Sequence, residues 1–233
     1  MPSYYCPELN SSRTVVMLEG EEFHHLSHVK RIAVGDSVML NSGTGHTATG
    51  KITDINKRNI SLAVLDCSYT EAPNPRYAIA FALLKNHHDE LLVEKCTELG
   101  ASKFYPLITE YVVREGSQNA VQRLKRISLA AIKQCDNPYL PEIQDILGLA
   151  QALEQIINDG FQPVLCSERR PEVWMTDLAE DLEPCFLIGP EGGWNDSEYE
   201  LFAELEIPEI TISPLVLRAE TAAIAAAAQF MVY

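Results

Sequence analysis

The residues best placed to do chemistry form a glycine-rich loop, Gly-Pro-Glu-Gly-Gly at positions 189–193. The loop follows four apolar residues, 185–188, that predict a buried strand, and it precedes a segment with helical periodicity. In an open α/β sheet, ligands bind at the carboxyl ends of strands. Glycines carry no side chain, so a ligand can approach their backbone closely. The loop is therefore a candidate ligand site, although glycine-rich connections between a strand and a helix are also common without a ligand.

The composition of this loop restricts the kind of ligand. It does not match G-x-G-x-x-G, the dinucleotide-binding fingerprint, and no Gly-Lys-Ser/Thr follows it, so it is not a P-loop. Glu191 lies inside the loop, and its carboxylate would repel a phosphate. A neutral or cationic ligand held by backbone amides and carbonyls fits better, and adenosine attached to a sulfonium is one example. A second irregular segment, residues 213–221, also lies between a predicted strand and a predicted helix, which makes it a candidate for the other wall of one pocket.

The elements that must position these segments change in character along the chain. Residues 14–18, 37–40, 46–55 and 60–64 predict short strands joined by tight turns, and residues 21–29 predict a short helix with an apolar stripe. Short strands joined in this way predict a small antiparallel barrel. Residues 71–76, with two prolines, are the best candidate for a linker.

After this linker, apolar strands alternate with helices. Strands are predicted at residues 77–84, 104–108, 162–166, 185–188 and 209–212, and helices at 89–99, 121–135, 149–157, 197–205 and 220–232. Ser197 and Glu200 are predicted to form a capping box. The last helix is apolar nearly all round, so it is expected to be buried in the core or in an interface. The alternation predicts an α/β domain with a mainly parallel sheet.

Composition sets further limits. The chain of 233 residues is 46% apolar and 22% charged, as expected of a globular protein with a sizeable core. Its N-terminus lacks a basic start and an apolar stretch, and no apolar run reaches the ~18 residues of a membrane span, so neither a secretory signal nor a transmembrane helix is predicted. The six cysteines are scattered with no C-x-x-C pair, which favours reduced thiols in a cytosolic setting over a disulfide frame or a zinc site.

The net charge of −15 argues against a nucleic-acid partner, but its distribution weakens that argument. Residues 1–76 hold seven Lys and Arg against eight Asp and Glu, which is close to neutral. Residues 77–233 hold the remaining eleven against twenty-five, so the second part carries almost all of the excess. The average charge therefore does not decide the question.

Five stretches together carry a resemblance to a known family. The most specific are IGPEGGWNDSE at 188–198 and LRAETAA at 217–223, and the others are HHLSHVKRIAVGD at 24–36, VEKCTELGASKFYPL at 93–107 and QCDNPYLPEI at 134–143. In this order, and over nearly the whole chain, they resemble the RsmE-type family. Its members are S-adenosylmethionine-dependent enzymes of the SPOUT class that methylate N3 of a uridine in 16S ribosomal RNA.

The resemblance implies a fold, a cofactor and partners. It implies an N-terminal PUA-like β-barrel that binds RNA (residues 1–72) and a C-terminal SPOUT domain with a deep trefoil knot (residues 73–233). It also implies a cytoplasmic homodimer that acts on the small ribosomal subunit, with the helix at 220–232 as a candidate interface. S-adenosylmethionine would lie in the knot, held mainly by backbone. The residues that the resemblance implies for the cofactor are Ser167, Ile188, Gly189, Pro190, Gly192, Gly193, Ile212, Leu215 and Leu217.

The implied reaction suggests roles for nearby charged residues. Uracil N3 is a weakly acidic imide nitrogen that must lose its proton before it attacks a sulfonium methyl group, so alignment and charge stabilisation are the main contributions expected of the enzyme. Arg218 is a candidate to bind a phosphate or the uracil oxygens; the alternative is a structural pair with Glu220. Glu220 or Glu191 is a candidate to assist proton loss, and the alternative for Glu220 is a carboxylate favoured by a helix N-terminus. Thr221 is expected to be a helix cap.

Basic residues and histidines supply candidates for contact with RNA. The best candidates for phosphate contacts are Arg13, Lys30, Arg31, Lys57 and Arg58, with an ordinary solvated surface as the alternative. No metal site is expected, because His24 and His28 are four residues apart without a third ligand and do not form H-E-x-x-H. His87 and His88 follow the first strand of the second part, and they are candidates for positioning a substrate.

The chain also departs from the family pattern. Asp136-Asn137 stand where the family often has Gly-Arg, and Lys133 stands where it often has Glu. These departures and the acidic second part leave a second function open, that of an RNA-binding or ribosome-assembly protein that keeps the fold without methyltransferase activity. A third function, that of an unrelated enzyme acting on a nucleotide phosphate, is disfavoured by the absence of a phosphate-binding motif.

Overall fold

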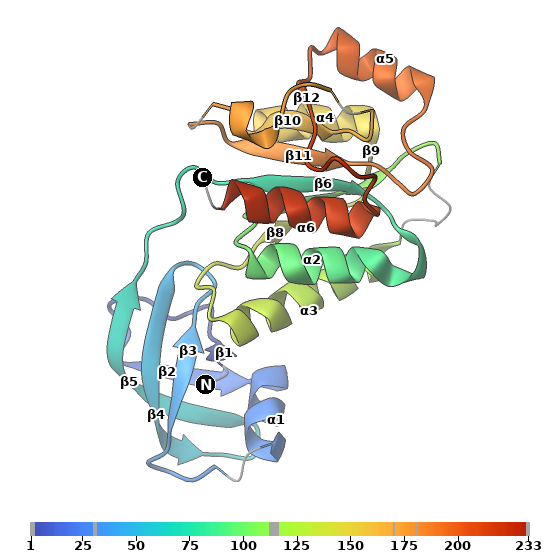
Figure 1. The fold of residues 1–233 in the computed structure, drawn as a ribbon. Coiled ribbons are helices and arrows are strands. Elements are labelled where there is room, and N and C mark those ends of the chain that lie inside the picture. The colour runs from blue at the N-terminus through green and yellow to red at the C-terminus, as the bar shows by residue number, and fades with distance from the viewer. Residues whose placement is uncertain (1–2, 30–31, 112–116, 170, 180, 232–233) are drawn as a thin grey trace. The chain divides into compact units, whose positions relative to one another are not determined.

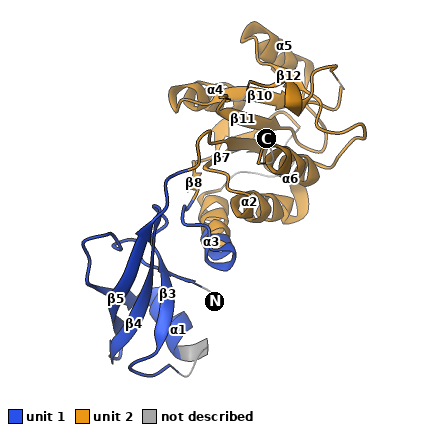
Figure 2. Ribbon diagram, turned by 60° about the vertical axis from the view of Figure 1, so that its left-hand side comes forward, with its two compact units in different colours: residues 1–72, 129–140 blue, residues 73–128, 141–233 orange. Residues whose placement is uncertain are grey.

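The computed structural model describes residues 3–29, 32–111, 117–169, 171–179 and 181–231. The chain divides into two compact units (Figure 2). The first comprises residues 1–72 and 129–140, and the second comprises residues 73–128 and 141–233. Among the described residues, no helix is both long enough and apolar enough to cross a membrane.

The first unit is built on one five-stranded sheet with the order β1-β3-β4-β5-β2. Its elements are β1 (Ser3–Tyr5), β2 (Val15–Glu19), α1 (Gly20–Val29), β3 (Ser37–Asn41), β4 (His46–Ile55) and β5 (Asn59–Tyr69). Three of the four strand pairs are antiparallel, as predicted, whereas β1, which the sequence patterns missed, runs parallel to β3. Along β2 the side chains alternate between water and the core, so Val16 and Leu18 are buried.

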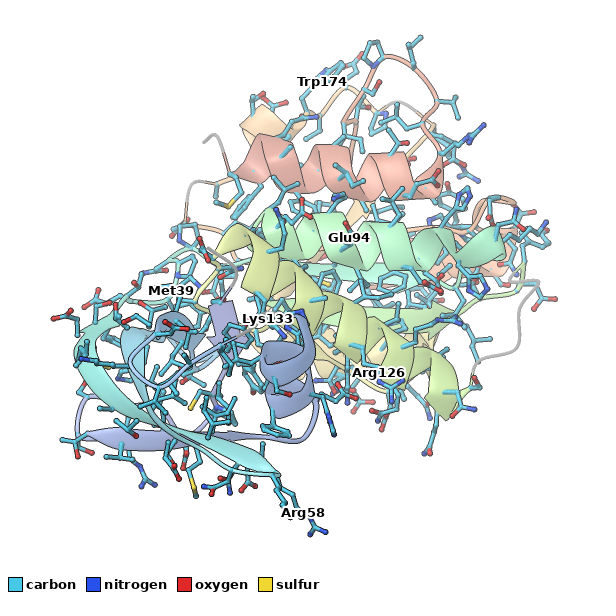
Figure 3. The ribbon with its side chains drawn as sticks, turned by 90° about the horizontal axis from the view of Figure 1, so that it is seen from below. Met39, Arg58, Glu94, Arg126, Lys133 and Trp174 are labelled. Carbon is cyan, nitrogen blue, oxygen red and sulfur yellow. The ribbon has the colours of Figure 1, made fainter. Side chains whose placement is uncertain are left out.

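Residues 129–140 belong to this first unit although they are distant in sequence. Lys133, near the end of helix α3 (Gln118–Cys135), places its Nζ 2.7 Å from Glu22 Oε1 (Figure 3). Asn41 donates from Nδ2 to the Asn137 carbonyl oxygen at 2.8 Å, and Asp136 takes a left-handed backbone with φ of 57°. Lys133 and Asn137, two of the residues that depart from the family pattern, therefore have structural partners within the unit.

The second unit contains a wholly parallel sheet with the order β12-β10-β11-β6-β7-β8, and β9 also pairs with β7. The strands are β6 (Ala78–Ala82), β7 (Lys103–Ile108), β8 (Glu142–Ile143), β9 (Leu147–Gly148), β10 (Gln162–Cys166), β11 (Pro184–Ile188) and β12 (Glu209–Ile210). Every residue of the two central strands β6 and β11 is buried. Continuous burial of this kind is expected of parallel strands that are covered on both faces.

Helices cover both faces of this sheet, giving three layers (Figure 1). They are η1 (Lys85–His87), α2 (His88–Glu98), α3, α4 (Leu149–Asn158), η2 (Met175–Asp177), α5 (Asp196–Glu204) and α6 (Ala219–Phe230). On one face, α2, α3 and α6 pack around Phe81 and Phe186, and on the other, α4 and α5 pack around Leu187. The predicted α/β architecture with a parallel sheet is thus confirmed.

Two predictions about helix starts are wrong. The capping box of α5 is formed by Asn195 and Glu198, not by Ser197 and Glu200: Asn195 Oδ1 accepts from the Glu198 amide at 2.7 Å, and Glu198 Oε2 accepts from the Asn195 amide at 2.8 Å. Ser197 lies inside the first turn, so it cannot be the cap. At α6 the cap residue is Arg218, which makes no side-chain capping bond, and Thr221 is an exposed residue of the first turn.

Candidate active site

A cavity of about 740 Å³ opens at the carboxyl ends of β6, β10, β11 and β12 in the second unit. The two irregular segments noted in the sequence form opposite parts of its lining. The predicted cofactor residues that line it are Ser167, Ile188, Gly189, Pro190, Gly192, Gly193, Ile212, Leu215 and Leu217, and the predicted catalytic residues Arg218 and Glu220 line it as well. The structure therefore brings this whole set together in one cavity.

The first wall is the glycine loop, and neighbouring side chains explain why its residues are glycines. A Cβ atom at position 189 would lie only 2.8 Å from Nε1 of Trp194, and one at position 192 would lie 3.1 Å from Cβ of Tyr111. Trp194 cannot move aside easily, because it is buried and packs edge-on against Phe202 at 5.1 Å. Gly193 adopts a positive φ of 75°, which favours glycine. Glycines at these positions are therefore required by the packing and backbone conformation of the loop itself.

Glu191, inside the same loop, ties it to the end of β6. Its Oε1 accepts a hydrogen bond from the Lys85 amide at 3.0 Å. The side chain was a candidate for proton removal, and this bond gives it a bracing role between two neighbouring strand ends. It also explains how the loop accommodates a carboxylate among glycines.

The second wall runs from the end of β12 to the start of α6. Leu215 and Val216 are 71% and 69% exposed, which is unusual for such large apolar side chains. An exposed apolar patch at the rim of a cavity indicates contact with a ligand or partner. Ser213 Oγ accepts from the Leu215 amide at 3.1 Å, and Gln229 donates from Nε2 to the Ile212 carbonyl oxygen at 2.9 Å. These bonds hold the irregular segment in place from both sides.

Ser167 follows strand β10 and lines the cavity, whereas Cys185 lies inside strand β11. Ser167 is buried at the end of β10, and its Oγ accepts from the Arg169 amide at 3.0 Å. Cys185 is fully buried in β11, where burial raises the pKa of its thiol well above the usual range. A thiol that stays protonated and buried is not a nucleophile.

The charged residues next to the second wall do not form the structural pair of Arg218 and Glu220 that the sequence left open. Glu220 does not pair with Arg218; instead its Oε1 lies 3.1 Å from Nδ1 of His88, and its side chain is only 10% exposed. Arg218 is exposed and forms no ion pair with any residue that the structure describes. Glu220 also lies in the first turn of α6, where the helix dipole favours a carboxylate.

Sequence patterns missed several residues of the cavity lining, namely Lys85, Asn86, Cys166, Glu168 and Ala222. The first two belong to a turn in which Asn86 and His87 both take left-handed backbone, with φ of 51° and 61°. A polar run directly after the buried strand β6 was the available signal, because the carboxyl ends of parallel strands meet at one edge of a sheet.

His87 does not line the cavity, and it belongs to a separate charged cluster. His87, Asp89 and Glu90 form the one group of potential metal ligands found among the described residues. Arg123 places Nη2 2.9 Å from His87 Nδ1 and Nε 2.8 Å from Glu90 Oε1. The guanidinium of Arg123 therefore already supplies positive charge next to the His87 and Glu90 atoms that could bind a metal ion.

The predicted RNA contacts that can be placed lie on the surface of the first unit. Lys57 and Arg58 are exposed in the turn between β4 and β5 (Figure 3). Arg13 is also exposed, with Nη2 3.9 Å from Glu8 Oε2. Lys30 and Arg31 lie outside the described residues.

Comparisons with known proteins agree with this architecture. Residues 70–231 match the RNA methyltransferase domain family, and residues 18–65 match the RNA methyltransferase PUA domain family. Ribosomal RNA small subunit methyltransferase E of Synechocystis sp. is 31% identical, over 92% of this chain and 72% of the relative. The Bacillus subtilis protein of the same name is 27% identical, over 88% and 85% of the two chains.

Solved structures share the fold. Ribosomal RNA small subunit methyltransferase E from Neisseria gonorrhoeae, bound to S-adenosyl methionine, aligns with a TM-score of 0.88 at 24% identity and covers 100% of this chain and 97% of its own. A putative methyltransferase from Legionella pneumophila, also in complex with this cofactor, gives a TM-score of 0.82 at 23% identity, with 99% and 97% covered. By its family match and its sequence identity to these relatives, the chain belongs to the ribosomal RNA small subunit methyltransferase E family.

Proposed function

We propose that this protein transfers a methyl group from S-adenosylmethionine to N3 of a uridine in the 16S ribosomal RNA of the small ribosomal subunit. One observation carries the proposal: the two most specific family stretches, separated by a strand and a helix, line a single cavity at the carboxyl edge of the parallel sheet. Ligands of α/β proteins bind at this edge. Family membership supplies the reaction class.

The chemistry of the cavity fits the cofactor. Ile188, Leu215 and Leu217 offer apolar contacts for an aromatic base, and Gly189 lines the same cavity. The carboxylates of Glu168 and Glu191 suit a ligand that carries positive charge. S-adenosylmethionine, when bound, supplies an electrophilic methyl group on a sulfonium. Ser167, at the end of β10, is proposed to contact its ribose or adenine.

Two residues are proposed to act on the nucleotide. Loss of the N3 proton leaves negative charge that is shared with the two uracil oxygens. Arg218 has no ion-pair partner among the described residues, so it is free to stabilise this charge or to bind a phosphate. Glu220 is the buried carboxylate of the lining, and it is proposed to assist proton loss.

Partners and location complete the proposal. The first unit is proposed to contact RNA phosphates through Arg13, Lys30, Arg31, Lys57 and Arg58. The protein is proposed to act in the cytoplasm as a homodimer formed through its second unit, with α6 contributing to the interface. The alternative of a non-catalytic assembly protein finds little support, because Lys133 and Asn137 have structural partners and the cavity residues are intact.

Nucleoside analysis of 16S RNA tests the proposal directly. The RNA is isolated from cells with the gene, without it, and with it restored, and N3-methyluridine is measured by mass spectrometry. We expect the modification to disappear on deletion and to return with the wild-type gene but not with Arg218→Ala. An unchanged level of N3-methyluridine in the deletion strain would overturn the proposal.

A further inference from the structure

Two side chains from different helices meet in the wall of the cavity. His88 is the first residue of α2, and Glu220 lies in the first turn of α6. Nδ1 of His88 and Oε1 of Glu220 are 3.1 Å apart, and the two side chains are 36% and 10% exposed. We propose that His88 accepts the N3 proton of the target uracil and that Glu220 holds the imidazole in the form that can accept it. The inference rests on the proposed function, because it assigns a step of that reaction.

The pair favours one nitrogen of His88 as the acceptor. A carboxylate only accepts hydrogen bonds, so Oε1 of Glu220, 3.1 Å from Nδ1, favours the form of the ring with its hydrogen on Nδ1. In a neutral imidazole the other nitrogen, Nε2, is then an acceptor. His88 lines the cavity, and its Nε2 makes no hydrogen bond to a described residue. The buried carboxylate thus leaves an unoccupied proton acceptor on a ring that borders the ligand space.

Other side chains of the lining are less suited to this step. Lys85 and Arg218 are cations and cannot accept a proton. Glu191 already accepts the Lys85 amide, and Glu220 is only 10% exposed and lies 3.1 Å from Nδ1 of His88. Glu168 is an exposed carboxylate, and a carboxylate is in general a weaker base than an imidazole. A proton acceptor works best when it titrates near the working pH, and imidazole does.

The backbone before His88 supports a functional placement. Asn86 and His87 take consecutive left-handed conformations, with φ of 51° and 61°. Residues other than glycine take this conformation uncommonly, and such positions cluster at functional sites. The strained turn joins β6 directly to α2, so it sets His88 at the carboxyl edge of the sheet.

The step is balanced with His88 as acceptor. The N3–H bond breaks, and the proton moves to His88 Nε2. The N3 electron pair forms the new bond to the methyl carbon, and the electrons of the carbon–sulfur bond remain on the sulfur, which becomes a neutral thioether. The resulting imidazolium faces the negative carboxylate of Glu220 and later returns its proton to water. A base placed in this way typically contributes about 10²–10⁴-fold to a rate.

Single-turnover methylation of a 16S RNA substrate by the full-length protein tests the assignment. We expect His88→Asn to lower the rate at least 100-fold and Glu220→Gln to lower it about 10-fold, with S-adenosylmethionine affinity, measured by calorimetry, unchanged within threefold. Glu94→Gln is the matched control for charge, because Glu94 lies on α2 outside the cavity lining and pairs with Lys95 at 2.7 Å (Figure 3). Added imidazole is expected to restore part of the activity of His88→Ala.

Two further measurements distinguish a base from a structural residue. The wild-type rate is expected to fall in acid, because a protonated imidazole cannot accept a proton, and this acid limb is expected to vanish in His88→Asn. Glu220 on α6 faces His88 directly, and the other charged side chains of the cavity lining are Arg218, Lys85, Glu168 and Glu191. Nitrogen NMR of the free protein is expected to show His88 protonated at Nδ1, and to show a mixture of forms in Glu220→Gln.

The outcomes separate this inference from the proposed function. If the wild type methylates the RNA and His88→Asn does so within twofold of its rate, the inference is wrong. It is also wrong if NMR finds the hydrogen of neutral His88 on Nε2, and this result holds even if His88→Asn fails to fold. If the wild type does not methylate the RNA at all, the proposed function fails, and the role assigned to His88 fails with it.

Discussion

The two edges of the parallel sheet in the second unit differ in how completely their charged side chains are paired. At the amino ends of the strands, Lys103 lies between Glu142 and Asp159, with Nζ 2.9 and 2.8 Å from their oxygens, and its side chain is only 12% exposed. Tyr105 donates its hydroxyl to the same Asp159 at 2.7 Å, and Arg76 pairs with Glu183 at 2.9 Å. Every charged group of this cluster has a partner.

At the carboxyl ends Glu220 pairs with His88, but other charged groups have fewer partners. Arg218 has no ion-pair partner among the described residues, and Glu191 holds a single backbone amide. Large apolar side chains such as Leu215 stand in water, and Asn86 takes a left-handed backbone. The parallel sheet therefore carries a fully paired ion network at the amino edge and an open cavity at the carboxyl edge. This contrast indicates that stability is concentrated at the amino edge and ligand binding at the carboxyl edge.

The largest expected effect comes from Gly189→Val at the carboxyl edge. The new side chain would meet the indole of Trp194, because even a Cβ atom would lie 2.8 Å from Nε1. Overpacking of this kind costs about 1–3 kcal/mol and must displace the loop. We expect calorimetry to show S-adenosylmethionine affinity lowered at least ~100-fold, or about 2.7 kcal/mol.

Gly192→Val is the matched control: its Cβ would meet Cβ of the half-exposed Tyr111 at 3.1 Å, so we expect a smaller loss. Equal affinity in wild type and Gly189→Val would contradict the assignment of this wall.

Asp159→Ala tests the opposite edge. The change leaves the nearly buried Lys103 with only the exposed Glu142, and it removes the acceptor of the Tyr105 hydroxyl. Losing one partner of a largely buried ion pair is destabilising, and because Asp159 is partly exposed we expect a loss of about 2 kcal/mol in the free energy of unfolding. Urea unfolding measures this loss, and S-adenosylmethionine affinity should stay unchanged. A large loss of affinity would show that the two edges are not independent.

The same variant carries a dependence on pH. Burial pushes the pKa of Asp159 upward, but hydrogen bonds from Lys103 and Tyr105 outweigh it, so the pKa is lowered in the folded protein. A lowered pKa gives a stabilisation that is complete above the ordinary value of about 3.9 and is lost as the pH falls through the folded value. The difference in stability between the wild type and Asp159→Ala should therefore be full at neutral pH and shrink in acid. A difference that grows in acid would contradict the assigned network.

Asn195→Ala tests the frame of the glycine loop with an effect of intermediate size. Asn195 caps α5, while Glu198 accepts both the Asn195 amide and, with its other oxygen, the Glu110 amide at 3.1 Å. Loss of a helix cap costs about 1 kcal/mol, which urea unfolding can measure. Ser197→Ala is the control, and we expect it to cost less, because Ser197 is not the cap. If Ser197→Ala lowered the stability more than Asn195→Ala, the capping box predicted for Ser197 and Glu200 would be supported instead.

Local patterns located most of the regular elements of both units, although the short strands β1, β8 and β9 were missed. The strand predicted at residues 46–55 is found as β4 with the same bounds. The capping box was misplaced by two residues because Asn195 and Ser197 are both followed three positions later by a glutamate. A pattern shared by two registers cannot decide between them, and in the structure Asn195 is the residue with the extended backbone of a cap, with φ of −83° and ψ of 174°.

Features that depend on long-range packing were not accessible in this way. Nothing in residues 129–140 indicates that they pack with the first unit, and the short strand β1 is recognised only through its partner β3. The cavity was predicted because both walls follow strands, whereas the pair of His88 and Glu220 depends on how α2 and α6 meet. The deep trefoil knot stays a prediction from the resemblance.

The smallest expected effect, that of Glu191→Gln, separates bracing from catalysis at the carboxyl edge. Glutamine keeps an oxygen that can accept the Lys85 amide, so only the charge is lost, and exposed charges contribute about 0–1 kcal/mol. We expect S-adenosylmethionine affinity to fall about twofold and to depend less on salt, while Glu191→Ala, which also removes the hydrogen bond, loses more. The single-turnover rate at saturating cofactor should be unchanged in Glu191→Gln. A large fall in that rate at normal affinity would mean that Glu191 acts on the nucleotide, and the carboxylate would then belong to the chemistry of the cavity and not to its frame.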